Sequence, residues 1–407
     1  MMSLCVLAAG MAIVPPEFKA EFKPWEHPEC WARELRSKRY PLQVSYSFES
    51  DDAIARQVLA TLEEAWQWQV EEVGFIPPFP RDPSGSGLYP VYLIRGAGTG
   101  VNSSGPLVRS DVNWSAHASY MTVDAWGPYA GSALEQTIHH EFQHALEAAY
   151  DWDEPGSIFE MSANFIQEKA RPGMNPGFDV ELADFQARPQ LAPHAYDDYE
   201  TYFMYGSWMY LAFLEQRYFP IEGAKLVERI WSGARSAPGQ AQPDWIDSLG
   251  SLLPKGTGYS DTVIEFARWR WYAGKKTRPA LWPFAYAPAP EHEVRVSGSL
   301  EADSPAVRIE DTRLLGTTYL RVPKPVGCDE VSIEFSGAPD AGWVLQAMPS
   351  LVTGVDGDRI EARLPFGDLS ERTLAVTAIP LSGTRPVPVQ SDAEYPYQIR
   401  VECLPAL

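Results

Sequence analysis

The stretch GSALEQTIHHEFQHALEAAY, residues 131–150, decides the fold that we expect. Its apolar residues recur at intervals of three and four, which is the period of a helix with one buried stripe, and neither Gly nor Pro interrupts the run that follows Gly131. Ser132 is followed three residues later by Glu135, a spacing typical of a capping box at the beginning of a helix. We therefore expect one amphipathic helix across this stretch.

The expected helix carries the pattern His-Glu-x-x-His at His140, Glu141 and His144. Side chains four positions apart on a helix lie about one turn apart, roughly 6 Å along the axis, and point in the same direction. Two imidazoles in this arrangement suit one tetrahedral zinc ion. Glu141 beside them is placed to take a proton from a zinc-activated water. The competing interpretation is a surface helix that carries two histidines by chance.

A second helix should supply the third ligand. The segment SIFEMSANFIQEKA (157–170) follows a short loop and has a helical period, with Ser157 as its N-cap. Glu160 lies sixteen residues after His144, far enough for a helix–loop–helix return to the first helix. We expect Glu160 to be the third zinc ligand, with water in the open fourth position. Asn164, one turn further on, would orient a ligand imidazole through its other nitrogen.

The third ligand has alternatives, because a carboxylate is needed and the segment offers several. Glu160 could instead be a solvated charge on an amphipathic helix. In that case Glu168 would be the ligand, followed by Asp151 or Asp153. All four residues follow the His-bearing helix closely.

The residue that stabilises the oxyanion of a tetrahedral intermediate is expected later in the chain. Zinc peptidases often use a Tyr or His side chain for this purpose. The aromatic, apolar segment 199–219 predicts a helix and contains Tyr205, which is our candidate. His194 is the second candidate, and packing in the core is the competing interpretation for both.

Composition restricts the class of protein. The chain has 407 residues, 45% of them hydrophobic, and a formal net charge of −21. This hydrophobic content supports large cores and excludes a disordered chain. The charge argues against nucleic acids and anionic membrane surfaces as partners. Residues 1–15 are apolar but too short to span a bilayer, and they could be a leader for export or a buried strand. No other stretch could cross a membrane.

The order of the expected elements predicts two domains. Strands at 42–48, 88–95 and 118–125, with a helix at 52–73, precede the His-bearing helix. The Gly-rich segment 96–106 has no phosphate-binding pattern and is expected to be a surface loop. A Pro-rich segment at 277–293 predicts a domain boundary, and the short alternating runs after it indicate an all-β sandwich. Cys328 and Cys403 both fall in this part, where they could form a disulfide or remain buried thiols.

The HEFQH helix followed by FEMSANFIQE, with the strands before them and the β-rich tail after them, resembles a family of exported bacterial zinc metallopeptidases. The family belongs to the zincin superfamily, and the chain is most similar to the branch with a Glu ligand. The resemblance implies that His140, His144 and Glu160 bind zinc and that Glu141 is the base. Members of that branch place the third ligand further from the second His and have Asp where this chain has Asn164.

Together these patterns predict an α+β protein. We expect a possible leader at 1–15 and a zincin-like domain at 16–285, in which a mixed sheet accompanies the active-site helix and a helical subdomain. A β-sandwich at 292–407 should be an accessory module. The expected activity is that of an exported, monomeric zinc metalloendopeptidase acting on peptides or proteins. The alternatives are an inactive binding protein on the same scaffold and a zinc hydrolase of non-peptide amides or esters.

Overall fold

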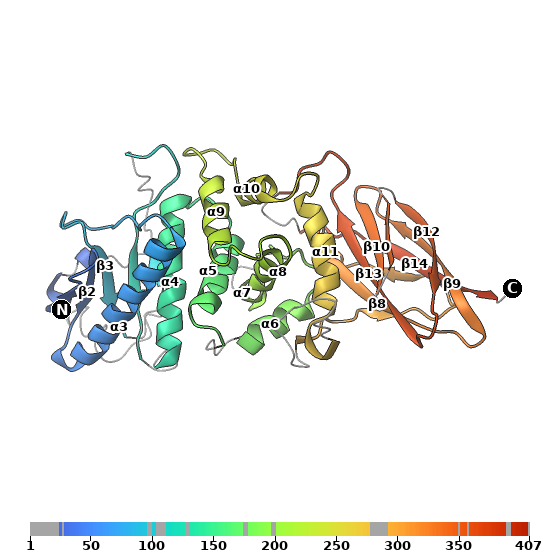
Figure 1. The fold of residues 1–407 in the computed structure, drawn as a ribbon, viewed down its shortest axis with the longest axis horizontal. Helices are drawn as coiled ribbons and strands as arrows, with labels where there is room; N and C mark the ends of the chain where they lie inside the picture. Colours follow the sequence, from blue (N-terminus) through green and yellow to red (C-terminus); the bar gives the residue numbers. More distant parts are fainter. Residues whose placement is uncertain are drawn as a thin grey trace. The chain divides into compact units, whose positions relative to one another are not determined.

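A computed structural model of the chain describes residues 24–26, 28–95, 100–102, 111–126, 131–173, 178–196, 201–276, 292–348, 351–355, 358–387 and 392–405. The chain divides into two compact units, each assembled from two segments. The first unit comprises Met1–Gly177 and Ile221–Leu252, and the second comprises Phe178–Pro220 and Leu253–Leu407. Both units contain helices and β-strands, so the expected α+β class is confirmed (Figure 1).

The division into units differs from the domains that we expected at 16–285 and 292–407. Helix α11 (Tyr259–Trp271) belongs to the same unit as the β-rich C-terminal part because it packs on strands β10 and β13. The Tyr319 hydroxyl donates a hydrogen bond of 2.7 Å to the carbonyl of Ala267, and its ring stacks on Trp271. The possible leader at 1–15 and most of the Pro-rich segment lie outside the described residues.

The first unit contains a mixed sheet of five strands in the order β1-β2-β3-β5-β4. Strands β2, β3 and β5 run parallel, whereas β1 and β4 pair antiparallel at the two edges. The three parallel strands are those predicted from the sequence, and β4 lies within the segment that we expected to be a loop. The bounds are β1 (Arg33–Arg36), β2 (Leu42–Tyr46), β3 (Tyr89–Leu93), β4 (Gly100–Asn102) and β5 (Tyr120–Val123).

Helices of the first unit accompany this sheet. The helix predicted at 52–73 is an α-helix that continues as a π-helix, and it ends at Gly74, whose φ of 107° favours glycine. The His-bearing helix α4 packs on β4, β5, α3 and α5. The bounds are α3 (Asp52–Ala65), the π-helix η4 (Trp66–Val73), α4 (Ser132–Tyr150), α5 (Gly156–Ala170), α9 (Lys225–Ala234) and α10 (Trp245–Leu252).

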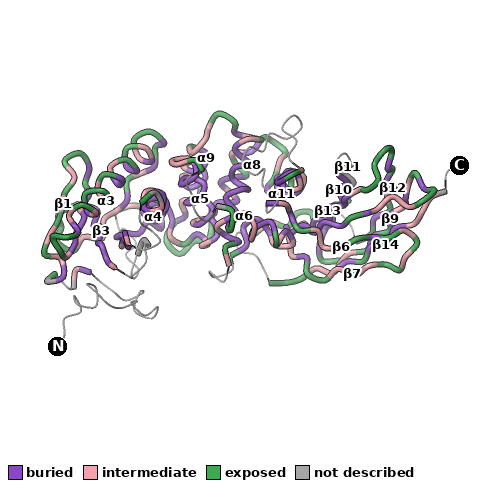
Figure 2. The backbone as a smooth tube through the Cα atoms, turned by 90° about the horizontal axis from the view of Figure 1, so that it is seen from below, coloured by how far each residue is buried: buried purple, intermediate pink, exposed green. Residues whose placement is uncertain are grey.

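The second unit combines helices with a β-sandwich. Helix α8 is buried along most of its length (Figure 2), as its aromatic, apolar sequence requires. The segment predicted as one helix at 199–219 forms two in its described part, α7 and α8. The helices are α6 (Phe178–Ala187), α7 (Phe203–Gly206), α8 (Trp208–Tyr218) and α11.

Two sheets form the sandwich. Their orders are β11-β10-β13-β8-β6 and β12-β9-β14-β7, and side chains from both sheets share one hydrophobic core around Trp343, Phe335 and Tyr397. The strand alternation read from the sequence is thus confirmed as a two-sheet packing. The bounds are β6 (Gly298–Ser299), β7 (Val307–Ile309), β8 (Thr317–Pro323), β9 (Cys328–Gly337), β10 (Gly342–Met348), β11 (Leu351–Val355), β12 (Arg359–Pro365), β13 (Glu371–Ile379) and β14 (Tyr397–Pro405).

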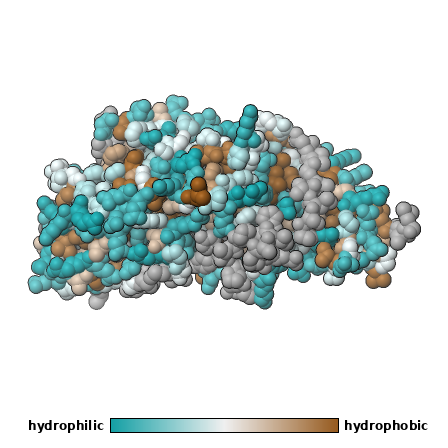
Figure 3. Space-filling view, viewed as in Figure 1, coloured by the Kyte–Doolittle hydropathy of each residue, from teal (hydrophilic) through white to brown (hydrophobic). Residues whose placement is uncertain are grey.

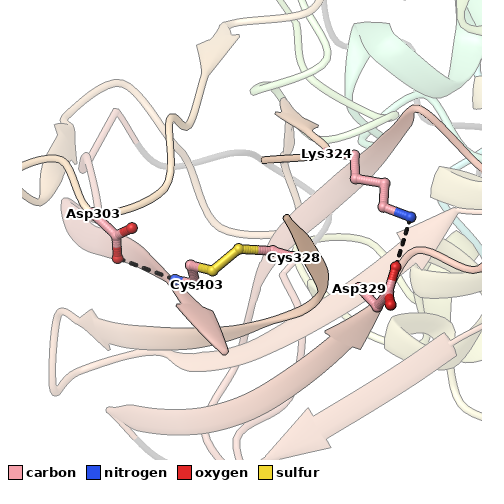
Figure 4. Close-up of a disulfide and its surroundings, with 5 residues drawn as sticks. All are labelled: Asp303, Lys324, Cys328, Asp329 and Cys403. Atoms are coloured by element: carbon pink, nitrogen blue, oxygen red, sulfur yellow. Dashed lines mark hydrogen bonds and ion pairs between the residues drawn. A yellow bond between two sulfur atoms is a disulfide. The ribbon is translucent and has the colours of Figure 1, made fainter. Parts of the chain in front are cut away.

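A disulfide joins Cys328 to Cys403 across the paired strands β9 and β14 (Figure 4). The two Cα atoms lie 5.9 Å apart, within the usual range for a disulfide. The backbone N–H of Cys403 also donates to Asp303, which connects the segment between β6 and β7 to strand β14. The sequence left open whether these cysteines form a disulfide or remain buried thiols, and in the structure they form the disulfide.

The surface carries mostly hydrophilic residues on the face that Figure 3 shows, with smaller hydrophobic groups between them. This agrees with the high content of acidic residues in the sequence. In the part of the chain that the structure describes, every helix is too short or too polar to cross a membrane.

Candidate metal centre

Helix α4 presents the two histidines of the motif from one face. Its first helical residue is Ser132, and Gly131 occupies the N-cap position with a φ of 72°, so the predicted capping role of Ser132 is wrong by one residue. The apolar residues at 134, 138, 142, 145 and 149 are all at most 1% exposed, and they hold the helix against the rest of the unit. Their burial leaves His140 and His144 on the side that faces α5.

Helix α5 returns alongside α4 and brings Glu160 to these histidines. It begins at Gly156 with Pro155 as its N-cap, so Ser157 lies inside the helix rather than before it. The Nε2 atoms of His140 and His144 are 3.0 Å apart. Glu160 Oε2 lies 3.3 Å from His140 Nε2 and 3.6 Å from His144 Nε2. Among the described residues these three form the group of side chains that could hold a metal ion.

The spacing of the three atoms fits a shared ion. Zinc bonds to His nitrogen or carboxylate oxygen are about 2.0–2.2 Å long, and a tetrahedron with such bonds has edges of roughly 3.3–3.5 Å. The measured separations of 3.0, 3.3 and 3.6 Å bracket that value. A cation can therefore be accommodated with shifts of only a few tenths of an ångström, and three protein ligands leave a fourth position open.

Electrostatics also favour a positive charge between these groups. Burial alone would raise the pKa of Glu160, but the neighbouring imidazoles outweigh it and hold that pKa well below its usual range. Burial opposes a charge on His144, yet the carboxylates of Glu160 and Glu147 raise its pKa well above the usual value. The carboxylate is thus ionised, and either a proton on His144 or a bound cation can balance it.

Glu147 is a residue of the centre that sequence reasoning missed. It lies on α4 three residues after His144, its side chain is fully buried, and its Oε2 is 2.8 Å from His144 Nδ1. We expected Asn164 to contact an imidazole, but its Nδ2 donates instead to the backbone carbonyl of Glu160 at 3.1 Å. The spacing from His144 to Glu147 could have revealed this pair, since residues three apart face the same side of a helix.

Glu141, the predicted base, lies on α4 directly after His140 and is 8% exposed. Burial chiefly raises the pKa of Tyr89 on β3, and the negative charge of Glu141 raises it further. Its role as a base stays a prediction.

The alternative carboxylates serve other contacts. Asp151 Oδ2 accepts hydrogen bonds from the backbone N–H and the hydroxyl of Ser236, at 2.9 and 2.6 Å. Asp153 accepts a hydrogen bond of 2.6 Å from the Ser115 hydroxyl. Glu168 is 4% exposed in α5 and does not belong to the group around His140. The structure therefore brings Glu160, and not these residues, to the two histidines.

The third histidine of the helix, His139, turns away from the centre into the core. It is 1% exposed, and Gln69 of the π-helix donates to its backbone carbonyl at 3.0 Å while lying 3.3 Å from its Nδ1. Burial, aided by the charge of Arg171, lowers the pKa of His139 to about 3. A neutral imidazole in this position serves packing rather than metal binding.

The two candidates for stabilising an oxyanion belong to the second unit. Tyr205 lies in α7, partly exposed, with its ring 6.2 Å from that of Tyr202. His194 is 2% exposed, and its Nδ1 lies within hydrogen-bonding distance of the Tyr259 hydroxyl, at 2.6 Å. Burial lowers the pKa of His194 to about 4, so this histidine is neutral in the core. The role assigned to Tyr205 stays a prediction.

Comparisons with known proteins assign no family. No protein-family model matches the chain. A search of curated proteins also finds no match. The pre-peptidase C-terminal domain of a collagenase from Bacillus anthracis is 13% identical, and the match covers 26% of this chain and 97% of that domain with a TM-score of 0.19. A GH115 4-O-methyl-alpha-glucuronidase with specificity for decorated arabinogalactans is 10% identical over 82% of this chain and 54% of its own, with a TM-score of 0.18. Similarities this low support no conclusion about fold or function.

Proposed function

We propose that this chain is a zinc metalloendopeptidase with a zincin-like arrangement of sheet and helices in its first unit. The observation that carries the proposal is the convergence of two imidazole nitrogens and one carboxylate oxygen, from His140, His144 and Glu160. Zinc binds such mixed nitrogen and oxygen ligands, whereas Mg²⁺ and Ca²⁺ prefer oxygen alone. Three ligands with one open position are typical of a catalytic zinc site and not of a structural one.

The surroundings of α4 support a peptide as the substrate. This helix packs on β4 and β5, and β4 is one of the two edge strands of the sheet. An edge strand has backbone N–H and C=O groups that can pair with an extended peptide, which adds to the sheet as a further strand. A peptide bound there would run beside the helix that carries the metal ligands.

The proposed reaction assigns a task to each residue of the motif. His140, His144 and Glu160 hold the ion, which when bound polarises the scissile carbonyl and lowers the pKa of a water molecule. Glu141 accepts the proton of the attacking water and transfers it to the leaving amine. Because Glu141 is 8% exposed, little bulk water competes for this proton.

Metal content together with a peptide-cleavage profile tests the proposal. The purified protein should contain about one zinc ion per chain, as a three-ligand site requires, and should cut members of an unbiased peptide library. The Glu141→Gln variant should keep the zinc and lose hydrolysis, because the amide cannot accept the proton. Hydrolysis that survives this substitution would refute the mechanism.

The same experiment separates the two other functions. A binding protein on this scaffold would hold the same ligand in the wild type and in Glu141→Gln, and neither would cut any peptide. A zinc hydrolase of small amides or esters would turn over small substrates and leave unfolded proteins intact.

A further inference from the structure

We propose that Glu147 is the positioning residue of the metal centre: it fixes the ring orientation and tautomer of His144 and thereby sets the affinity for the cation. The inference rests on the proposed function, because it assumes that His144 is a ligand. Glu147 belongs to the same helix as His144 and is fully buried, so its carboxylate has exchanged water for protein contacts.

The contact between Glu147 and His144 involves the nitrogen that a cation would not use. His144 Nε2 faces His140 and Glu160, at 3.0 and 3.6 Å, and Nδ1 faces Glu147 Oε2 at 2.8 Å. An ionised carboxylate can only accept a hydrogen bond, so Nδ1 must carry the proton. Neutral His144 is then in the tautomer whose Nε2 lone pair would be available to bind a cation.

Glu147 is held directly by side chains of α4 and α5, and indirectly by a side chain of α9. Its Oε1 accepts a hydrogen bond of 3.1 Å from Gln143 Nε2 on α4 and lies 2.5 Å from the Ser162 hydroxyl on α5. That hydroxyl also lies 2.6 Å from the Ile158 carbonyl, so its single proton is shared, and it accepts a hydrogen bond of 3.1 Å from Trp231 Nε1 on α9. These contacts prevent the carboxylate from turning away, which keeps the imidazole in place.

Charge balance supports the same role. A buried carboxylate is costly unless it is paired. The two carboxylates that contact the His144 ring are Glu147 and Glu160, and both are buried. Together they carry the negative charge that offsets a divalent cation. Glu160 does so as a ligand, and Glu147 does so through its hydrogen bond with the imidazole of His144.

Zinc affinity of the full chain, measured by competition with a chromophoric chelator, tests the inference. Glu147→Gln keeps the acceptor oxygen and the shape but loses the charge, and it should bind zinc about tenfold more weakly than the wild type. Glu147→Leu also loses the acceptor and should bind about 100-fold more weakly. Glu154→Gln makes the same substitution at another buried glutamate of the same unit, one that contacts the Trp245 backbone, and should leave the affinity unchanged.

The outcomes distinguish a positioning role from a purely structural one. Unfolding of each metal-free variant is measured in parallel. A zinc affinity that falls from the wild type to Glu147→Gln and further to Glu147→Leu supports the inference. Glu147→Gln remains informative if the Leu variant does not fold. Variants that unfold more easily yet bind zinc as tightly as the wild type would overturn this inference but not the proposed function. A wild-type protein that binds no zinc would overturn both the inference and the proposed function.

Discussion

Raising the pH from about 6 to about 8 should destabilise the first unit through one buried carboxyl group. Glu154 follows α4, is 9% exposed, and accepts a hydrogen bond of 2.9 Å at Oε1 from the backbone N–H of Trp245. Burial, followed by the negative charges of Asp244 and Asp151, raises the pKa of Glu154 to about 9 from the ordinary value of 4.5. Glu154 is therefore protonated in the folded protein at neutral pH and ionised in the unfolded chain.

The magnitude follows from this difference in bound protons. Between the two pKa values the folded state binds one more proton than the unfolded state, so the contribution is fully present below pH 4.5 and is lost as the pH rises toward 9. One proton corresponds to about 1.4 kcal/mol for each pH unit, which is about 2.7 kcal/mol between pH 6 and pH 8.

Urea unfolding of the wild type and of Glu154→Gln, measured at both pH values, isolates the contribution of this group. The amide is neutral at every pH and keeps an oxygen for the Trp245 N–H. The variant should gain about 2.7 kcal/mol in free energy of unfolding relative to the wild type from pH 6 to pH 8, since effects of other groups cancel in the difference. A difference that is the same at both pH values would show that Glu154 is ionised in the fold and refute this reasoning.

Three further predictions concern the metal centre and the sandwich. Glu160→Ala should lower zinc affinity at least 100-fold more than Glu168→Ala, because only Glu160 lies within reach of both histidines, and equal affinities in chelator competition would contradict this. Treatment with a strong chelator should abolish peptide hydrolysis, and added zinc should restore it, whereas activity that persists without metal would exclude a zinc mechanism. Replacing Cys328 and Cys403 by Ser should lower the free energy of unfolding of the second unit by about 4.5 kcal/mol, because the disulfide closes a loop with a sequence separation of 75 residues. An unchanged urea midpoint would argue against this.

Local patterns were sufficient for most elements of the fold. The helical period of 131–150 predicted α4 to within one residue, and the alternation after residue 294 predicted the sandwich strands β8, β9, β10, β13 and β14 but not β6, β7, β11 and β12. The same patterns predicted that His140 and His144 share a face, because a helix alone determines which side chains lie one turn apart. They also selected Glu160, whose helix was recognisable from its own period.

Contacts between distant segments required the tertiary structure. Both His139 and His140 occur in the motif region, but only the packing of the π-helix against α4 shows that His139 faces Gln69 in the core. The grouping of α11 with the sandwich and the pairing of Cys328 with Cys403 likewise depend on how separate segments meet.

The sequence by itself determined that a donor set would contain His140 and His144, which lie one turn apart on one helix, but it left the carboxylate open among Glu160, Glu168, Asp151 and Asp153. The tertiary structure alone decided how that set is supported. Glu147 is held by a hydroxyl from α5 that is in turn bonded to an indole from α9, sixty-nine residues further along the chain. No local period encodes such a contact, since it exists only when the apolar faces of three helices are buried together.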